Sequence, residues 1–280
     1  MQNIDYAKME LNKYYYLMTG EKEHNINLRV DQELKSLFKS SHNLSIFDDA
    51  YQVNIYQSQG EIIGINARSV LLAVYELLTN LGCRFIKPKT VNEYINKIKP
   101  EEFTARFTTV PANRHRTICI EGSTSLENAL DMVEWAPKVG FNGYFIQFRT
   151  AHEFFERWYT RQRNNYVEGQ NYSVDDSIAN TKRIIAAIKE RNLIYHAVGH
   201  GWTTECLKIP SIGWKTINLN EITPDKQELL ALINGEREFF KGVPLNTQLC
   251  YSNKLAQNLI VDEIVNYAIK HPEIDILHFW

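Results

Sequence analysis

Two histidines, His196 and His200, stand close together in a largely apolar segment, and Trp202 and Glu205 follow at once. A spacing of four residues places both imidazoles on the same side of a β-strand. Imidazole nitrogens hydrogen-bond to hydroxyl groups, and an indole ring offers a flat apolar surface. These side chains could therefore bind a sugar, through its hydroxyls and its apolar C–H face.

Two other interpretations of these histidines stay open. With Cys206 they could contribute to a zinc site, but zinc needs three or four protein ligands and the sequence has no helical HExxH motif. They could also be buried histidines whose nitrogens are satisfied by backbone groups. We expect no metal and no cofactor.

Gln147 and Arg149 end another apolar run. The guanidinium of Arg149 could bind a carboxylate through two hydrogen bonds, which would suit a uronate better than a neutral sugar. Alternatively, Arg149 forms a salt bridge with the acidic side chains of the segment that follows, residues 152–156.

Three further candidate binding residues lie at the ends of two other apolar runs. Glu121 follows residues 117–120 and could reach a sugar hydroxyl, or it could cap the strand or pair with Arg116. His278 and Trp280 close the last run, where Trp280 could form a wall of a binding subsite.

These candidates share a place at the ends of predicted strands. The strands alternate with predicted helices and cover residues 117–120, 144–148, 193–198 and 274–279. Such alternation predicts a parallel sheet with helices outside it, and sites form at the carboxyl ends of such strands. No glycine-rich nucleotide-binding motif follows the first strand, which favours a (β/α) barrel.

The first 87 residues show a different rhythm, which predicts a small α+β domain. Apolar residues at helical spacing end at Gly20, and a second apolar helix, residues 68–81, ends at Gly82. Between them we expect strands at 27–30, 51–55 and 62–65, the last two joined by a turn at residues 58–60.

Residues 88–112 are polar and contain three prolines, so we predict a connecting segment there and a second domain over residues 113–280. A complete barrel takes about 250 residues and eight strands. This region holds only four predicted strands. We therefore expect an α/β fold in which the α+β domain precedes the first half of a (β/α)8 TIM barrel. The given sequence would then be a truncated part of a longer protein.

The composition excludes several classes of protein. The chain has 280 residues, 44% of them hydrophobic and 23% charged, with a net charge of −2, which is typical of a globular protein and gives no reason to expect nucleic-acid binding. No apolar run approaches the roughly 20 residues of a membrane span, and the N-terminus lacks signal-peptide features. The four cysteines form no CxxC motif, so we expect free thiols. The sequence leaves the oligomeric state and the compartment open.

Several segments resemble known families. GINARSVLLAVYELLTNLGCRFIKP, at residues 64–88, resembles the small domain that precedes the barrel in bacterial β-N-acetylhexosaminidases (glycoside hydrolase family 20) and α-glucuronidases. RTICIE, at residues 116–121, resembles the first barrel strand of family 20. HAVGHGWTTECLKIPSIGW, GVPLNTQLCYSN and HPEIDILHFW are most similar to the bacterial proteins of domain of unknown function 4838.

The resemblance implies an eight-stranded barrel whose catalytic acid pair follows the fourth strand, and hence lies just beyond Trp280. It also implies that Arg116 holds sugar hydroxyls, with an ion pair near the domain junction as the alternative. We expect a glycoside hydrolase-like protein acting on a carbohydrate of hexosaminide or uronide type. The alternative is a non-catalytic carbohydrate-binding protein, or inactive fragment, on the same scaffold. Related enzymes are often exported, which would place the full-length protein in the periplasm or outside the cell.

Overall fold

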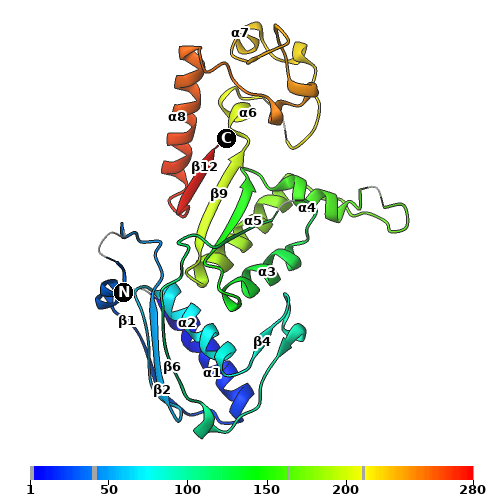
Figure 1. Ribbon diagram of the computed structural model, residues 1–280. Helices are drawn as coiled ribbons and strands as arrows, with labels where there is room; N and C mark the ends of the chain where they lie inside the picture. Colours follow the sequence, from blue (N-terminus) through cyan, green and yellow to red (C-terminus); the bar gives the residue numbers. More distant parts are fainter. Residues whose placement is uncertain (1–2, 40–42, 121, 163, 210–211, 280) are drawn as a thin grey trace. The chain divides into compact units, whose positions relative to one another are not determined.

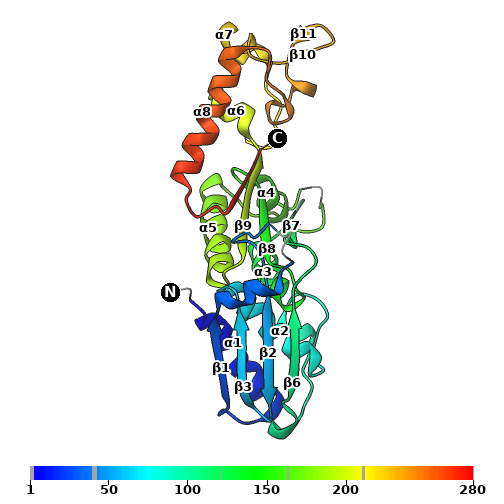
Figure 2. The same ribbon diagram turned by 60° about the vertical axis from the view of Figure 1, so that its left-hand side comes forward.

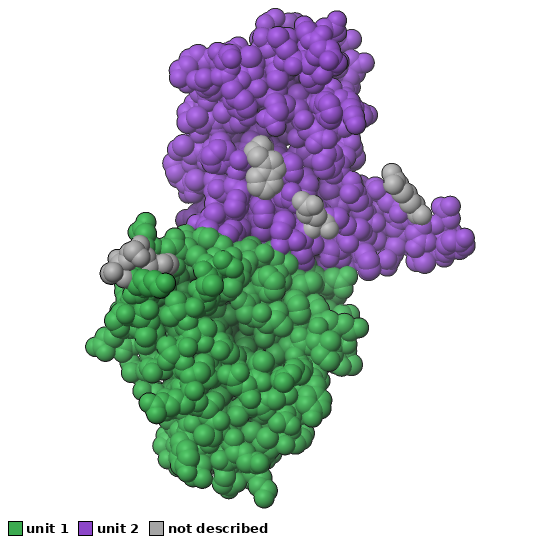
Figure 3. Space-filling model, viewed as in Figure 1, with its two compact units in different colours: residues 1–118, 127–144, 184–194 green, residues 119–126, 145–183, 195–280 purple. Residues whose placement is uncertain are grey.

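The computed structural model describes residues 3–39, 43–120, 122–162, 164–209 and 212–279. The chain divides into two compact units, coloured separately in Figure 3. Unit 1 comprises residues 1–118, 127–144 and 184–194, and unit 2 comprises residues 119–126, 145–183 and 195–280. Each unit is described by itself.

Unit 1 contains a four-stranded sheet in the order β1-β3-β2-β6 among the described residues (Figure 2). Its strands are β1 (Asn25–Val30), β2 (Tyr51–Tyr56), β3 (Gln59–Gly64) and β6 (Ala105–Thr109). Strand β1 runs parallel to β3, whereas β2 is antiparallel to both β3 and β6. The three strands predicted in the first 87 residues are therefore present.

Two helices, α1 (Asp5–Thr19) and α2 (Ala67–Asn80), supply much of the apolar core of unit 1 (Figure 1). Helix α1 ends where Gly20 adopts a left-handed conformation with φ 79°, which an L side chain rarely tolerates. Helix α2 begins at Asn66, whose side chain accepts a hydrogen bond from the Ser69 amide. Both predicted helices are confirmed.

Two details of unit 1 differ from the sequence prediction. The turn between β2 and β3 lies at Gln57 and Ser58, both with positive φ, because Tyr56 pairs with Gln59 in the ladder. Strand β6 lies within residues 88–112, the predicted connecting segment, and pairs with β2. Its polar, alternating sequence suits an edge strand, which explains why composition alone indicated a connection. The proposed domain boundaries stay a prediction.

The other elements of unit 1 are short, apart from α3. They are η1 (Gln32–Leu37), β4 (Arg84–Phe85), η2 (Thr90–Asn92), β5 (Glu93–Tyr94), η3 (Pro100–Glu102) and most of α3 (Leu126–Lys138), where η denotes a 3-10 helix. Strands β4 and β5 pair antiparallel.

A second four-stranded sheet has the order β12-β9-β8-β7 within the described part of the chain. It consists of β7 (Thr117–Ile120), β8 (Gly143–Phe148), β9 (Ile194–His200) and β12 (Ile276–Phe279). Strands β9 and β12 are parallel, with Ile276 opposite His196. The predicted α/β fold with a parallel sheet is thus present, and helix α5 (Val174–Glu190) lies between β8 and β9 in sequence. The complete barrel remains a prediction.

Unit 2 also contains helices for which the sequence analysis gives no bounds. Helix α4 (His152–Tyr159) follows β8. Helix α8 (Lys254–Lys270) begins after Asn253, whose side chain accepts hydrogen bonds from the amides of Leu255 and Ala256.

The long segment between β9 and α8 has its own small apolar core. It contains α6 (Trp202–Cys206), η4 (Leu219–Glu221), α7 (Pro224–Gln227), β10 (Leu232–Ile233), β11 (Glu236–Arg237), η5 (Phe240–Gly242) and η6 (Pro244–Asn246). Leu230, Phe239 and Leu249 are among the buried residues of this core. Across the residues with described positions, no helix is long and apolar enough to cross a membrane.

Candidate functional site

The imidazoles of His196 and His278 lie together on adjacent parallel strands, β9 and β12. His196 Nδ1 is 3.0 Å from His278 Nε2, a hydrogen bond in which one ring donates and the other accepts. The ring of Phe145 in β8 lies 4.6 Å from that of His278. His196 is buried. Two of the predicted site residues are therefore in direct contact, although the sequence separates them by 82 positions.

His200 ends β9 beside aromatic side chains. Its ring stacks on Phe148 at 5.2 Å between centroids, and the indole of Trp214 meets it edge to face at 6.4 Å. His200, Arg149 and Glu205 line a shallow hollow at the ends of β8 and β9. Its volume is about 40 Å³. That is room for a water molecule but far less than the roughly 300 Å³ at which ligand pockets begin.

Trp202 does not offer a face for stacking in this structure. Its side chain is only 2% exposed, its Nε1 donates to the carbonyl oxygen of His278 at 3.2 Å, and its ring packs edge to face against Tyr267. The expected sugar-stacking role of Trp202 is corrected accordingly, because the first turn of α6 buries the indole. Trp214 is only partly buried and packs against His200, whereas the ring of Phe148 lines the hollow itself.

The guanidinium of Arg149 is held by two carboxylates. Its Nη1 donates to Glu263 in α8 at 2.7 Å, and its Nη2 lies 3.8 Å from Glu205 in α6. The same group lies over the ring of Tyr267 at 4.4 Å. Arg149 therefore forms salt bridges, but with Glu205 of α6 and Glu263 of α8 and not, as the sequence analysis expected, with the acids of residues 152–156.

The acidic side chains that follow Arg149 have other partners. Glu153 pairs with Arg157 at 3.0 Å, and Glu156 lies 3.6 Å from His152. His152 is buried against Ser177, to which its Nδ1 is hydrogen-bonded at 2.8 Å. Helix α4, which the sequence analysis missed, turns these acids inward toward local partners.

Gln147 is buried in β8, and its Oε1 lies 3.9 Å from the thiol of Cys119. Glu121 and Trp280, two further predicted site residues, lie outside the residues that the structure describes.

Arg116 belongs to a buried charge network in unit 1. Its Nη2 lies 2.9 Å from Asp49 Oδ2, and its other donors reach the carbonyl oxygens of Asn113 and Gly140. The fully buried carboxylate of Asp49 also accepts from Arg68 Nε at 2.8 Å and from Asn142 at 2.7 Å. The ion-pair interpretation of Arg116 is thus realised. Arg116 directly precedes β7, whereas Gln147, His196 and His278 lie within their strands and His200 ends β9.

The described residues provide no cluster of three or more histidine, cysteine or acidic side chains that could hold a metal. Burial raises the pKa of Cys206 to about 11, and its Sγ lies 3.3 Å from the carbonyl oxygen of Thr203.

Trp214 was not among the predicted site residues, although it closes a segment quoted for the family resemblance. Its amide donates to Glu153 Oε1 at 3.1 Å. Gly213 has φ +68°, and a Cβ there would come within 1.7 Å of the same oxygen. The glycine before Trp214 was the available signal, since a side chain at this position would adopt an unfavourable positive φ and would require Glu153 to move.

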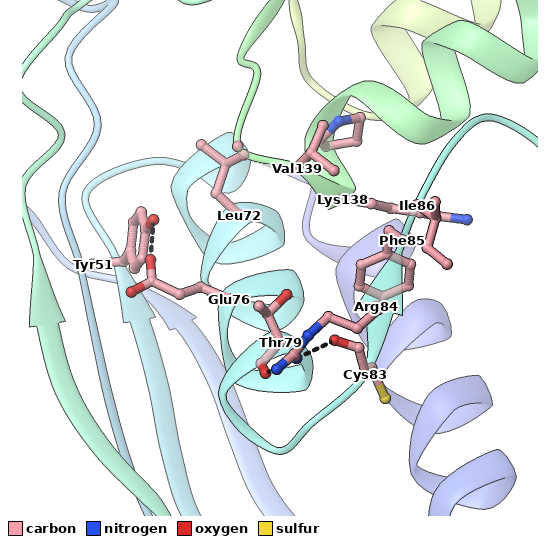
Figure 4. A pocket seen from close by; sticks show the side chains of 12 residues that line it. Tyr51, Leu72, Glu76, Thr79, Cys83, Arg84, Phe85, Ile86, Lys138 and Val139 are labelled. Atoms are coloured by element: carbon pink, nitrogen blue, oxygen red, sulfur yellow. Dashed lines mark hydrogen bonds between the residues drawn. The ribbon is translucent and has the colours of Figure 1, made fainter. Parts of the chain in front are cut away.

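A larger hollow lies within unit 1 (Figure 4). It has a volume of about 420 Å³ and is bordered by α2, the segment around β4 and the last turn of α3. Sequence analysis singled out none of its lining residues.

Comparison with known proteins gives distant structural similarity. No protein-family model and no curated protein matches the chain. Two solved structures of Streptomyces plicatus β-hexosaminidase, one with the product GlcNAc and one with Thio-NAglucal, are 13% and 14% identical, with TM-scores of 0.48 and 0.49. Each match covers 98% of this chain and 52% of the enzyme. A family 20 exo-β-N-acetylglucosaminidase from Vibrio harveyi is 12% identical, with a TM-score of 0.47, over 94% of this chain and 39% of its own. The chain therefore spans about half the length of the Streptomyces enzyme.

Proposed function

We propose that this chain belongs to a glycoside hydrolase-like protein and that its strand ends bind the carbohydrate. The observation that carries the proposal is the contact between His196 and His278 beside Phe145. It brings polar and aromatic groups together on the neighbouring strands β8, β9 and β12, one of which ends at His200. Such combinations suit sugars, which present hydroxyls and an apolar ring face. His200 and Trp214 extend the same surface.

The state of Arg149 favours a neutral sugar over a uronate. A uronate carboxylate would have to compete with Glu263 at 2.7 Å and with Glu205 at 3.8 Å. A guanidinium already bound by two carboxylates offers little net attraction to a third. Of the two substrate classes that the sequence suggests, we therefore propose the hexosaminide type.

The catalytic acids of this protein stay a prediction, placed after Trp280 by the family resemblance. Glycoside hydrolysis uses a proton donor and a second group that stabilises the cationic sugar ring. Glu205 and Glu263 are both engaged with Arg149. We assign these two acids to positioning Arg149.

This engagement also favours the alternative, a non-catalytic carbohydrate-binding role, for the described part of the chain. The two proposals differ in turnover of an aryl glycoside. A binding protein would retain sugar affinity and release no aryl alcohol.

Calorimetric titration tests the binding proposal. N-Acetylglucosamine is expected to bind more tightly than glucuronate, and His200→Ala is expected to weaken that binding at least tenfold. His271→Gln, at the end of α8, is the matched control and should bind as the unsubstituted chain does. Equal affinity for the two sugars would contradict the conclusion that the pairing of Arg149 disfavours a uronate. If His200→Ala bound the sugar as tightly as the unsubstituted chain, the proposed binding site would be wrong. Release of 4-nitrophenol from the aryl N-acetylglucosaminide would decide between hydrolysis and binding alone.

A further inference from the structure

The 420 Å³ pocket in unit 1 lies in the size range of small-molecule sites, about 300–1,000 Å³. Aliphatic side chains form much of its wall. Leu72 comes from α2, Ile86 follows β4, and Pro137 and Val139 come from the end of α3. Figure 4 shows Leu72 and Val139 on one side of the pocket, with Glu76 and Arg84 nearby. The pocket thus combines an apolar wall with two charged groups of opposite sign.

Glu76 supplies the negative charge. Its half-buried carboxylate accepts hydrogen bonds from the hydroxyls of Tyr51 at 2.6 Å and Thr109 at 2.9 Å. A carboxylate can accept about four hydrogen bonds, so acceptor capacity remains. Glu76 forms no ion pair with any residue in the described part of the chain. Both of its hydroxyl partners are neutral, so its charge is not compensated by a cation.

Arg84 supplies the positive charge. Its Nη1 donates to the carbonyl oxygens of Thr79 and Cys83, at 2.9 and 2.7 Å, which fixes the guanidinium at the pocket. Among the residues with described positions, no carboxylate pairs with Arg84, and Glu76 in particular does not. The Nε and Nη2 donors have no hydrogen-bond partner in the same set of residues. Arginine with donors to spare is well suited to a carboxylate.

Lys138, the other cation of the pocket wall, is already neutralised. Its Nζ lies 2.7 Å from Glu93 and 2.8 Å from Glu134, and the side chain is buried. Lys138 therefore attracts no further anion. The charges that the pocket leaves uncompensated are one carboxylate and one guanidinium.

We propose that this pocket binds a free aliphatic α-amino acid. The ammonium of the ligand would meet Glu76, its carboxylate would meet Arg84, and its branched side chain would pack on Leu72, Ile86 and Val139. A zwitterion compensates both protein charges at once, and an aliphatic body buries the apolar wall. This site is separate from the strand-end surface and does not depend on the proposed carbohydrate function.

Calorimetry on the full chain tests the proposal with L-leucine and three analogues. 4-Methylpentanoate lacks the ammonium, 3-methylbutylamine lacks the carboxylate, and glycine lacks the aliphatic body. Leucine is expected to bind at least tenfold more tightly than each analogue. Equal affinity of leucine and either single-charge analogue would overturn the proposal, as would the absence of binding by leucine at 20 mM.

Variants locate the binding. Arg84→Gln should lower the affinity for leucine at least tenfold. It should leave the affinity for 3-methylbutylamine unchanged, since that amine has no carboxylate to contact Arg84. Arg106→Gln removes an exposed arginine of β6 outside the pocket lining and should leave both affinities unchanged. If Arg84→Gln bound leucine with unchanged affinity, the proposed site would be wrong. Because the ligand series uses the unsubstituted chain, it decides the proposal even if a variant fails to fold.

Discussion

The imidazole nitrogens of His196 and His278 are 3.0 Å apart, which joins β9 to β12 through their side chains as well as through the backbone ladder. A hydrogen bond between two imidazoles needs a donor nitrogen on one ring and an unprotonated acceptor on the other. The pair is buried on the His196 side and flanked by Phe145. It is the contact on which the proposed sugar-binding surface depends.

Loss of His278 should destabilise unit 2. His278→Ala removes the hydrogen bond to the buried ring of His196, and the loss of such a bond costs about 0.5–1.5 kcal/mol. Urea unfolding followed by circular dichroism measures the change in the free energy of unfolding. His271→Gln alters a half-buried histidine of the same unit that bonds Glu273 and packs on Tyr267, and it should cost less than His278→Ala. An equal loss in the free energy of unfolding for both variants would contradict a stabilising role of the contact between His196 and His278.

Asp49 should be among the side chains to which stability is most sensitive. Its carboxylate is fully buried and joins Arg68, Arg116 and Asn142. Asp49→Ala leaves the buried guanidinium of Arg68 without its anion, and removing one partner of a buried ion pair typically costs about 3–5 kcal/mol. Thermal unfolding of the variant measures this loss.

The variant Arg116→Gln distinguishes between a structural role and a sugar-binding role of Arg116. The structure predicts a lower Tm and an unchanged affinity for N-acetylglucosamine, because Arg116 already bonds Asp49 and two carbonyl oxygens. A fall in sugar affinity without a fall in Tm would support the role implied by the family resemblance instead.

Gly213→Ala should displace the segment that carries Trp214. A methyl group there would lie within 1.7 Å of Glu153 Oε1, and φ +68° is unfavourable for alanine. We expect a loss of about 1–3 kcal/mol and a shifted tryptophan emission spectrum. Gly235 also has a positive φ but has open space around it, so Gly235→Ala isolates the cost of the backbone conformation from that of the collision.

The cysteines of unit 2 should differ in reactivity. Burial raises the pKa of Cys206 to about 11, whereas a hydrogen bond from Arg237 lowers the pKa of Cys250. Iodoacetamide reacts with thiolates, so at pH 8 Cys250 should be alkylated faster than Cys206 in the native protein. Mass spectrometry of the digested protein gives both rates, and Arg237→Gln should slow the reaction of Cys250 alone.

The raised pKa of Cys206 also gives a dependence of stability on pH. The folded state holds this proton more tightly than the unfolded state, whose ordinary thiol value is 9.0. The corresponding stability is present below pH 9 and is lost as pH rises from about 9 to about 11. Cys206→Ala should show a smaller decline in Tm over this range. An identical decline would contradict the assignment to Cys206.

Apolar periodicity was sufficient to predict most of the regular elements. The spacing of Leu11, Tyr14, Tyr15 and Met18 predicts α1, and all four side chains are buried. Strand β6 escaped prediction because Ala105–Thr109 is short, contains a charge and has only two apolar residues. Helix α4 escaped because its buried residues include His152 and Glu153, whose polarity resembles that of a loop until their partners are known.

The candidate site was predictable in part. The strand-end pattern singled out His196 and His278, which are in contact. The partners of Arg149 could not be predicted, since Glu263 is 114 positions away along the chain and belongs to a helix with no strong amphipathic pattern. The burial of Trp202 likewise depends on the packing of α6 against α8, which residue spacing does not specify.

The most direct test of the central claim is NMR titration of the histidine ring protons with N-acetylglucosamine. The proposed function predicts that the signals of His200, His196 and His278 shift with a common saturation curve. The signals of His24 and His115, both in unit 1, should stay in place. No shift of the signals of His196, His200 and His278 at saturating sugar, or equal shifts of all five, would contradict carbohydrate binding at β9 and β12.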